Sequence, residues 1–241
     1  MSQSLILVGN GITAEILSEY IRDDSRYTIA VATVDDAHVD KGTFNEVACT
    51  ALSQVTIDFP PGQHKALMAV GYSDLNRTRE NLFRKIKDLG YEVLTYIHPD
   101  ARVYCQEPIE EGSIIMPGAV IEHHAKVGKN SVIWCNTTIA HHGTVGEHCW
   151  IASGAVVSGQ AKVGNNSFIG VNATIVNKVE IGEYNIVGAA AMIAKCTKPL
   201  SVYLARSGEP FRYSSEEYTK YFLEREHDCG QKIDVPAGGD I

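Results

Sequence analysis

Two short segments, IEHHAKVG and IAHHGTVG, place a pair of histidines at the same position after an isoleucine. His123 and His124 form the first pair, and His141 and His142 form the second pair 18 residues later. Histidine changes its charge near neutral pH, so it serves both as a general base and as a metal ligand. The repeated pair therefore indicates acid–base or metal chemistry. Which of the two applies depends on how the surrounding elements place the histidines.

Valine or isoleucine occupies every sixth position of one long segment of the chain. A period of six fits neither the 3.6-residue period of a helix nor the two-residue period of an ordinary strand. A small residue usually stands two positions before each aliphatic one, as at Ser131, Ala155 and Ala173. This pattern is the hexapeptide repeat of a parallel β-helix, a prism of short stacked strands with the aliphatic side chains along its axis. The sixteen positions are Val103, Ile109, Ile115, Ile121, Val127, Ile133, Ile139, Val145, Ile151, Val157, Val163, Ile169, Ile175, Ile181, Val187 and Ile193.

A second period, of 18 residues, is superimposed on the first and makes one coil of three hexapeptides. Residues 18 apart then stack on neighbouring coils about 4.8 Å apart. This places His123 beside His141 and His124 beside His142, and the row of His141 continues to Gly159. The histidines follow an inward aliphatic residue by two and three positions, so we expect them at a corner of the prism, facing outward. The glycines that mark the 18-residue period are Gly128, Gly146, Gly164 and Gly182.

Before the repeat, strand-like and helix-like segments alternate. The segment SLILVGNGITAEILSEYI indicates a strand, a glycine turn and an amphipathic helix, and YTIAVATVDD indicates a second strand that ends at Asp35 and Asp36. The runs ALMAVG and YEVLTYIHP indicate a third and a fourth strand, with a helix between them that ends at Gly90. The turn GNGITA fits the GxGxxA pattern, which lets phosphate approach the backbone and the helix N-terminus. The alternative is a tight strand-to-helix turn that binds nothing.

These patterns predict an α/β plus β chain with three parts. Residues 1–98 form a small Rossmann-like domain with a parallel sheet, although they hold little more than half of a full dinucleotide-binding fold. Residues 99–195 form the parallel β-helix, and residues 196–241 form a C-terminal extension. In this extension, SSEE gives a capping box that opens a helix to about Arg225, and we expect this helical tail to cap the open end of the prism.

Composition excludes several classes of function. The chain has 241 residues and a formal net charge of −8, which argues against a nucleic-acid partner. No stretch approaches the roughly 20 apolar residues of a membrane helix, and the N-terminus lacks the basic region of a signal peptide. The six cysteines are scattered without a CxxC motif, which favours reduced thiols. We therefore expect a cytoplasmic protein that does not bind a membrane.

The sequence resembles the bacterial nucleotide-linked amino-sugar N-acetyltransferases, a family that includes the bacillosamine-pathway acetyltransferase and lies within the sialic acid O-acetyltransferase group. The resemblance covers about residues 3–195 and rests on VGNG, VDD, AVGYSDLNRTRE, IIMPGAVI, NTTIAHHGTVGEHCWIASGAVVSG, VGNNSFIGVNATI and IVGAAAMI. It implies a left-handed β-helix, a homotrimer with active sites at the subunit interfaces, and acetyl-CoA as co-substrate. It also implies a nucleotide-linked amino sugar, in particular a 4-amino-4,6-dideoxy sugar on dTDP or UDP, for surface glycans such as O-antigen and lipopolysaccharide.

The resemblance matches the family's catalytic histidine to His141 and its backbone donor to the thioester oxygen to Gly159. A neutral histidine is suited to take the proton that an attacking amine loses, and a nearby His123 imidazolium would keep His141 uncharged. Gly159 stacks next to His141, and without a side chain its N–H is open to a developing oxyanion. His142 stands where the family has an acid, so the group that orients His141 stays open.

The remaining candidate residues line the expected binding sites for the two substrates. For acetyl-CoA we expect Gly159 together with residues of the lower coils, and the ending LARSGEPFRY differs from the family's usual one. For the nucleotide sugar we expect the glycine turn, the end of the second strand, the segment after the third strand, and the first histidine pair. The cofactor candidates are Gly170, Gly188, Ala189 and Lys195, and the substrate candidates are Gly9, Asn10, Gly11, Asp35, Asp36, Gly71, Tyr72 and His123.

Three other functions stay open on the sequence. The first is O-acetylation of a sugar hydroxyl, or transfer of a longer acyl chain from a carrier protein. The second is a zinc enzyme like the β-helix carbonic anhydrases, but those take ligands two coils apart, whereas the histidine pairs here are one coil apart, so we expect no metal. The third is a non-catalytic scaffold or sensor for nucleotide sugars.

Overall fold

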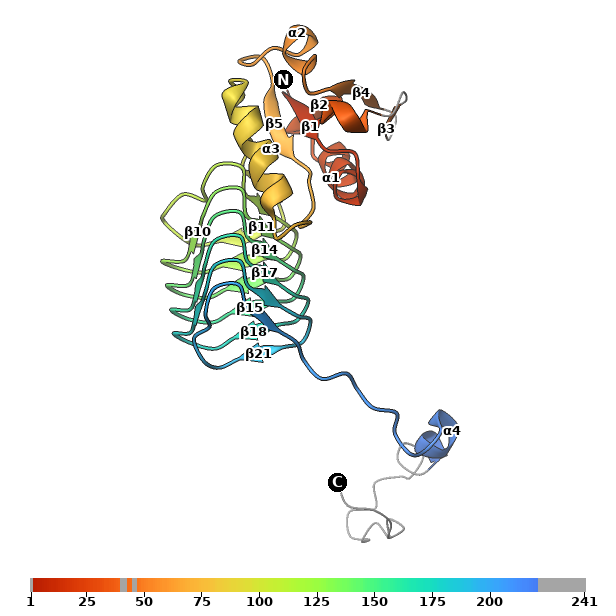
Figure 1. Cartoon of the computed structure of the whole chain (residues 1–241), viewed down its shortest axis with the longest axis vertical. Helices are drawn as coiled ribbons and strands as arrows, with labels where there is room; N and C mark the ends of the chain where they lie inside the picture. Colours follow the sequence, from red (N-terminus) through yellow and green to blue (C-terminus); the bar gives the residue numbers. More distant parts are fainter. Residues whose placement is uncertain (1, 40–42, 45–46, 221–241) are drawn as a thin grey trace. The chain divides into compact units, whose positions relative to one another are not determined.

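The computed structural model describes residues 2–39, 43–44 and 47–220. The chain divides into two compact units, Met1–Ala205 and Arg206–Ile241. The first unit holds an N-terminal α/β domain and the prism (Figure 1).

The N-terminal domain is built on a five-stranded sheet with the strand order β3-β4-β2-β1-β5. The pairs β1–β2, β1–β5 and β2–β4 are parallel, and β3–β4 is antiparallel. The apolar residues of β1, β2 and β5 are buried at the centre of this sheet because both of its faces are covered. The elements are β1 (Gln3–Val8), α1 (Ile12–Asp23), β2 (Tyr27–Val34), the 3-10 helix η1 (Asp36–His38), β3 (Thr43–Phe44), β4 (Val47–Ala51), α2 (Val55–Asp58), β5 (Lys65–Met68) and α3 (Arg77–Asp88).

The predicted alternation of strands and helices is present, with two differences. The sequence analysis did not predict β3, β4 and α2, and β4 takes the place next to β2 in the sheet. The expected fourth strand, YEVLTYIHP, contributes only an isolated bridge between Ala66 and Val93 to this region. Its last part, Tyr96–Ile97 (β6), pairs with Ile114–Ile115 (β8) instead and covers the first edge of the prism. The apolar run is buried in both settings, so its hydrophobicity alone did not reveal which sheet it joins.

The prism consists of three parallel sheets of two-residue strands. In chain order, the first sheet holds β6-β8-β11-β14-β17-β20-β22, the second β7-β9-β12-β15-β18-β21 and the third β10-β13-β16-β19. The further strands are β7 (Arg102–Val103), β9 (Val120–Ile121), β10 (Lys126–Val127), β11 (Val132–Ile133), β12 (Thr138–Ile139), β13 (Thr144–Val145), β14 (Trp150–Ile151), β15 (Val156–Val157), β16 (Lys162–Val163), β17 (Phe168–Ile169), β18 (Thr174–Ile175), β19 (Glu180–Ile181), β20 (Ile186–Val187), β21 (Met192–Ile193) and β22 (Val202–Tyr203).

The register of these strands confirms the predicted repeat. The strands pair 18 residues apart, as Ile139 does with Val157, except for the last pair, β20–β22, in which Ile186 pairs with Val202. Fourteen of the sixteen aliphatic positions are buried, and Val103 and Ile109 in the first coil are partly buried against the same core. The core of the prism is therefore one continuous column of valine and isoleucine side chains.

Among the described residues, histidine occupies left-handed turn positions at two of the three corners of the prism. We call the turn between the second and third sheets the histidine corner, where His124, His142 and Gln160 have positive φ angles of 61°, 58° and 61°. We call the turn between the third and first sheets the docking corner. Its residues Asn130, His148 and Asn166 have φ angles of 52°, 58° and 58°. Left-handed residues of this kind close each hexapeptide, and Asn is favoured there among residues other than glycine.

The N-terminal domain is fixed to the docking corner by the first turns of α3. Arg79 is fully buried, and its guanidinium donates hydrogen bonds to the backbone oxygens of Asn130, His148 and Cys149. The side chain of Asn76 donates to the backbone oxygen of Asn166 at 3.1 Å. Burial lowers the pKa of Arg79 to about 10, so it stays charged at neutral pH. A five-donor cation that bonds several backbone carbonyls holds α3 in one orientation on the coils.

The second unit is described as far as residue 220. The predicted capping box is present in α4 (Ser215–Tyr218): the Ser214 hydroxyl accepts from the Glu217 N–H, and the Glu217 carboxylate accepts from the Ser214 N–H. The predicted helix end at Arg225 lies outside the described residues, and the covering of the prism stays a prediction. Within the described part of the chain, none of the helices has the length and apolar character needed to span a membrane.

Candidate active site at a corner of the prism

His141 lies at the histidine corner with its ring directly against Gly159 on the next coil. A Cβ atom added to Gly159 would lie 2.5 Å from both Cε1 and Nε2 of the His141 ring. Any side chain at position 159 would therefore displace the imidazole. The two turns are also tied together by a 2.9 Å hydrogen bond from the Gln160 N–H to the His141 carbonyl. The stacking of His141 on Gly159 that the 18-residue period predicts is present.

The backbone N–H of Gly159 makes no hydrogen bond to any residue that the structure describes. Its carbonyl oxygen accepts from the Lys178 N–H at 3.1 Å, so only the donor is left over. Gly159 itself is buried beneath the His141 ring. A basic ring nitrogen and an unused backbone donor thus lie side by side, which is the pairing that acyl transfer requires.

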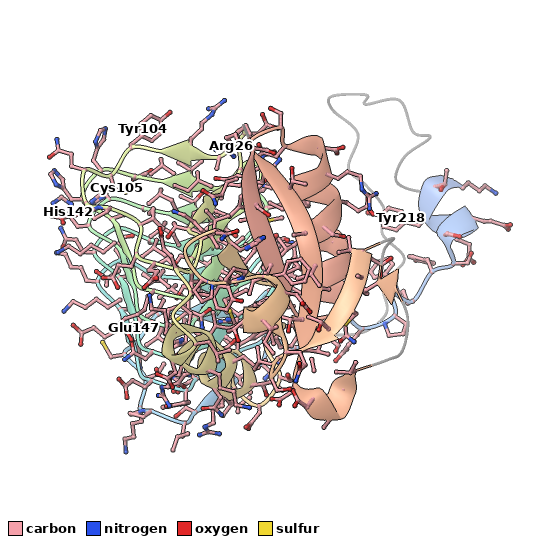
Figure 2. All side chains as sticks on the ribbon, turned by 90° about the horizontal axis from the view of Figure 1, so that it is seen from above. Arg26, Tyr104, Cys105, His142, Glu147 and Tyr218 are labelled. Carbon is pink, nitrogen blue, oxygen red and sulfur yellow. The ribbon has the colours of Figure 1, made fainter. Side chains whose placement is uncertain are left out.

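Besides Gly159 and Gln160 on the next coil, the groups around His141 come from its own turn and from the coil before it. The Glu122 carboxylate accepts a 2.7 Å hydrogen bond from the backbone N–H of His141 and so fixes the turn. Nδ1 of His142 lies 3.4 Å from Nδ1 of His141. The His142 ring in turn packs on the His124 ring, with centroids 4.7 Å apart. The ring of His123 packs against Tyr104. In Figure 2 the labelled His142 and Tyr104 lie at the edge of the prism that faces away from the N-terminal domain.

A separate cavity of about 730 Å³ lies in the N-terminal domain at the carboxyl ends of β1, β2 and β5. Gly11 at the start of α1 borders it, and a Cβ added there would meet no atom within 4 Å. Packing of the protein therefore does not require glycine at position 11, whereas a ligand that approaches the backbone does. Gly9 differs, because its φ is +124° and a Cβ would lie 2.6 Å from the Ala69 oxygen.

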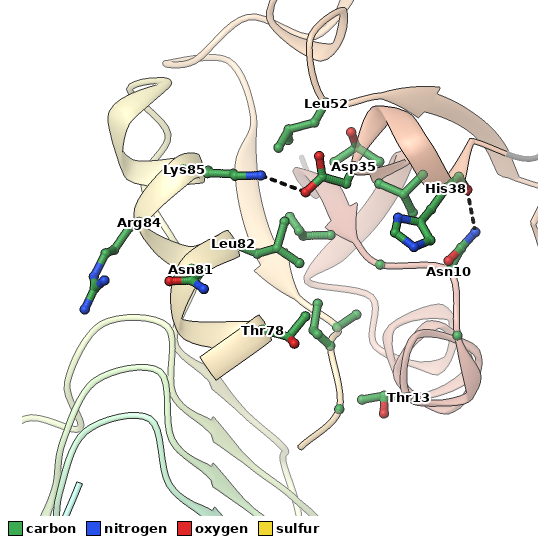
Figure 3. Close-up of a pocket in the computed structure, with 18 of the residues that line it drawn as sticks. Asn10, Thr13, Asp35, His38, Leu52, Thr78, Asn81, Leu82, Arg84 and Lys85 are labelled. Atoms are coloured by element: carbon green, nitrogen blue, oxygen red, sulfur yellow. Dashed lines mark hydrogen bonds and ion pairs between the residues drawn. The ribbon is translucent and has the colours of Figure 1, made fainter. Parts of the chain in front are cut away.

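Polar groups stand on opposite walls of this cavity (Figure 3). Asp35 follows β2 and forms a 2.7 Å ion pair with Lys85 of α3. The Asn10 side chain donates a long hydrogen bond to the His38 carbonyl and so ties the glycine turn to η1. An open helix N-terminus, a carboxylate and a lysine suit a ligand with phosphate groups and hydrogen-bonding ring atoms.

The structure brings together five of the predicted substrate residues and places three elsewhere. Asp36 lies outside the cavity, where hydrogen bonds from the Ser53 side chain and then from the Ser53 N–H lower the pKa of its carboxyl. Tyr72 packs on Trp150 and Phe168 of the prism. His123 belongs to the histidine corner. The roles of these three stay predictions. The five residues in the cavity are Gly9, Asn10, Gly11, Asp35 and Gly71.

The sequence analysis missed the part of the cavity that α3 and η1 supply. These residues follow no motif, although the i, i+3, i+4, i+7 spacing of four of them on α3 places them on one helix face. The missed residues are His38, Thr78, Asn81, Leu82 and Lys85.

The predicted acetyl-CoA residues lie on the lower coils. A Cβ added to Gly170 would lie 2.6 Å from the backbone of Ala189, so coil packing by itself requires glycine there. A Cβ at Gly188 would meet the Leu204 side chain at 2.8 Å. Ala189 and Lys195 are exposed. Their roles toward acetyl-CoA stay predictions. Among the described residues, no group of three or more His, Cys, Asp and Glu side chains is arranged to hold a metal ion.

Comparison with known proteins confirms the repeat and the fold. Residues 109–141, 142–177 and 160–195 match the family model described as bacterial transferase hexapeptide (six repeats). No curated protein sequence matches the chain significantly. Solved structures do match, and they share the fold of this chain.

Three of these structures cover most of both chains. PerB from Caulobacter crescentus, in complex with CoA and GDP-perosamine, is 24% identical with a TM-score of 0.73 over 85% of this chain and 95% of that chain. The acetyltransferase domain of PglB from Neisseria gonorrhoeae, in complex with acetyl coenzyme A, is 23% identical with a TM-score of 0.61 over 88% and 100%. WeeI from Acinetobacter baumannii is 19% identical with a TM-score of 0.72 over 83% and 96%. Residues 109–195 are therefore hexapeptide repeats, and the chain shares the fold of these structures, among them the CoA-bound PerB and the acetyl-coenzyme-A-bound PglB domain.

Proposed function

We propose that this chain transfers the acetyl group of acetyl-CoA to the amino group of a nucleotide-linked amino sugar. The observation that carries the proposal is the contact of the His141 ring with Gly159, whose N–H has no acceptor among the described residues. The fold shared with PerB, which was crystallised with CoA and GDP-perosamine, supports the same substrates here. We place the sugar in the 4-amino-4,6-dideoxy class, linked to dTDP, UDP or GDP, for surface-glycan synthesis.

In this mechanism the sugar nitrogen attacks the thioester carbonyl carbon and forms the new C–N bond. Nε2 of His141 takes the proton that the sugar amine loses. We assign this role to Nε2 because the ring edge formed by Nε2 and Cε1 lies against Gly159. The Gly159 N–H donates to the carbonyl oxygen as negative charge develops on it. The C–S bond then breaks, and the CoA sulfur leaves as a thiol with the proton that His141 had taken, which returns His141 to its neutral state. General base catalysis of this kind contributes about 10²–10⁴-fold in rate.

The cavity of the N-terminal domain holds the nucleotide in this proposal. The diphosphate lies on the glycine turn and the N-terminus of α1, where the open space beside Gly11 leaves room for it. Lys85 and Asp35 supply opposite charges on the two walls. The CoA chain follows the lower coils toward Gly159, past Gly170, Gly188, Ala189 and Lys195.

The two halves of the proposed site belong to different faces of one chain. All residues that line the cavity come from the N-terminal domain, which packs on the first sheet and the docking corner. His141 stands at the histidine corner, between the second and third sheets. One copy's cavity and a neighbouring copy's His141 therefore form a complete site in an assembly, and we propose a homotrimer with sites at its interfaces.

The test is release of free thiol from acetyl-CoA with dTDP-, UDP- and GDP-linked amino sugars, together with mass spectrometry of the product. We expect thiol release with an amino sugar and a product heavier by one acetyl group. If the acetyl group is found only on a sugar hydroxyl, the protein is an O-acetyltransferase and N-acetylation is wrong. If no sugar in the panel releases thiol, the proposal is wrong.

A second arm tests the nucleotide site separately from the chemistry. Gly11→Val places a branched side chain in the open space beside the turn. We expect at least tenfold weaker binding of the nucleotide sugar, measured by calorimetry, with an unchanged melting temperature. Gly208→Ala, which also meets no neighbouring atom, serves as the control that leaves nucleotide binding unaltered.

A further inference from the structure

We propose that His142 is a positioning residue that sets the tautomer of His141. In this arrangement Nδ1–H of His141 donates a hydrogen bond to Nδ1 of His142, so the proton of neutral His141 stays on Nδ1. Nε2 is then left unprotonated, ready to accept the proton of the substrate amine. The inference rests on the proposed function, because it gives His141 the role of the base.

The contacts of the His141 ring indicate which of its two nitrogens carries the proton. Its Nε2 and Cε1 lie against Gly159, whose N–H is unused, so we take Nε2 as the nitrogen on the reacting side. Its Nδ1 points the other way, 3.4 Å from Nδ1 of His142. Two neutral imidazoles form a hydrogen bond only when one nitrogen donates and the other accepts. If His142 were the donor, Nε2 of His141 would carry the proton and would not act as a base.

The position of His142 is held by the fold. Its backbone is left-handed, with φ at 58°, because the turn of the hexapeptide requires that conformation. Its ring packs against the His124 ring, which limits its rotation. The Glu122 carboxylate bonds the backbone N–H of His141 and fixes the peptide unit just before it. Two rings on adjacent residues are thus held at an interplanar angle of 82°.

A histidine in this place behaves differently from a carboxylate. A carboxylate accepts the Nδ1–H bond at every pH at which it is ionised. An imidazole that takes up a proton becomes a donor at both nitrogens, which reverses the bond and moves the proton of neutral His141 to Nε2. Activity therefore requires both rings to be unprotonated. Several other titratable groups lie at the same corner as His142. His141 belongs to its own turn, and Glu122, His123 and His124 belong to the preceding turn. Tyr104 packs against His123.

The experiment compares two variants that both tolerate a left-handed backbone. His142→Asn keeps an acceptor, the amide oxygen, that does not titrate. His142→Gly removes the acceptor without adding strain at a positive φ. We expect kcat of His142→Asn to stay within about threefold of wild type, and kcat of His142→Gly to fall about tenfold to 100-fold, with KM within about twofold.

The pH dependence of kcat tests the positioning role, because a purely structural role of His142 would leave its acid-side slope unchanged. On the acid side, the plot of log kcat against pH has a limiting slope one unit steeper in wild type than in His142→Asn. The titration of the substrate amine is common to both proteins and cancels in this comparison. Lys178→Asn, a left-handed position two coils further along the same corner, is expected to keep the wild-type slope and rate.

Nitrogen NMR of ¹⁵N-histidine-labelled full-length protein separates this inference from the proposed function, because it needs no substrate. At pH 8 we expect Nδ1 of His141 to be protonated in wild type and in His142→Asn, and Nε2 to be protonated in His142→Gly. Equal tautomers in all three proteins, or equal slopes in wild type and His142→Asn, would overturn the inference. The expected tautomers without thiol release from any amino sugar would leave the inference standing and overturn the proposed function instead.

Discussion

The histidine corner and the docking corner of the prism use the same local backbone in opposite surroundings. His142 at the histidine corner and His148 at the docking corner both close a hexapeptide with φ at 58°. His142 is exposed and has histidine rings as neighbours. His148 is buried under α3, where its Nδ1 accepts a 2.8 Å hydrogen bond from the Asn130 amide and its ring meets the Phe83 ring edge-to-face.

The comparison separates what the repeat provides from what its surroundings add. The repeat supplies a row of outward polar positions at each corner, one per coil. Where another domain covers the row, the side chains are bonded by that domain and serve as attachment. Where the row is left open, as at His141 and His142, the side chains are exposed, and it is here that we propose the substrates bind. Burial also lowers the pKa of His148, which keeps it neutral and suited to accept a hydrogen bond.

The largest expected effect lies at the docking corner. Arg79→Met leaves the buried backbone oxygens of Asn130 and His148 without a donor, whereas the Cys149 oxygen keeps the Val132 N–H. Each buried acceptor that loses its partner costs about 1–3 kcal/mol, so we expect the free energy of unfolding to fall by about 4 kcal/mol. Urea denaturation followed by circular dichroism measures this change.

The matched control for that variant is Arg77→Met on the same helix. Arg77 is only partly buried, and its guanidinium carbon lies 4.8 Å from the centroid of the Tyr184 ring. We expect a loss of about 1 kcal/mol or less, because exposed ion pairs and cation–π contacts contribute little. Equal losses in the two variants would contradict the view that Arg79 fixes α3 to the coils.

A smaller effect is expected at the histidine corner from Gly159→Ala. The added Cβ would lie 2.5 Å from the His141 ring and push it from its place. We expect kcat to fall about 100-fold, since a displaced base loses most of its contribution. In a His141→Ala background the same substitution meets no ring, so it should cost little further. Full additivity of the two losses would show that the contact does not matter for catalysis.

The smallest expected effect is a pH dependence of stability that arises at the docking corner. The pKa of His148 is lower in the folded than in the unfolded protein, so the unfolded chain binds the extra proton first as pH falls. The stability that His148 contributes is therefore full above about pH 6.5 and decreases below it. His148→Asn, which suits the left-handed turn, should reduce the loss of melting temperature between pH 7.5 and pH 5. If the melting temperature of His148→Asn falls as much between pH 7.5 and pH 5 as that of wild type, the pH dependence arises from other groups.

The sequence predicts the prism well because its constraint is periodic. A six-residue step determines which side chains form the core, and an 18-residue step determines that His141 stacks on Gly159. The contacts of the N-terminal domain are different in kind. In the sequence, Arg79 has the pattern of an ordinary surface charge on an amphipathic helix. The residues near it do not predict that it bonds backbone carbonyls of residues about 50 to 70 positions later.

The same limit applies to the histidines and to the cavity. His142 and His148 occupy equivalent turn positions, so the repeat alone does not tell the exposed residue from the buried one. GNGITA indicates the floor of the cavity, because a glycine turn before a helix has a local signature. His38 and Lys85 have no such signature, since their places depend on how η1 and α3 pack against the sheet. Strands β3 and β4 were missed because their pairing is set by the same packing.

We propose that the histidine corner performs the chemistry while the docking corner holds the domains together. The most direct test measures thiol release from acetyl-CoA and melting temperature in His141→Ala and His148→Asn, with the amino sugar that wild type accepts. We predict that His141→Ala loses about 10³-fold in kcat with an unchanged melting temperature, and that His148→Asn keeps its rate within about threefold but melts earlier. A His141→Ala protein that retains the wild-type rate, or a His148→Asn protein that folds as stably but loses catalysis, would contradict the account.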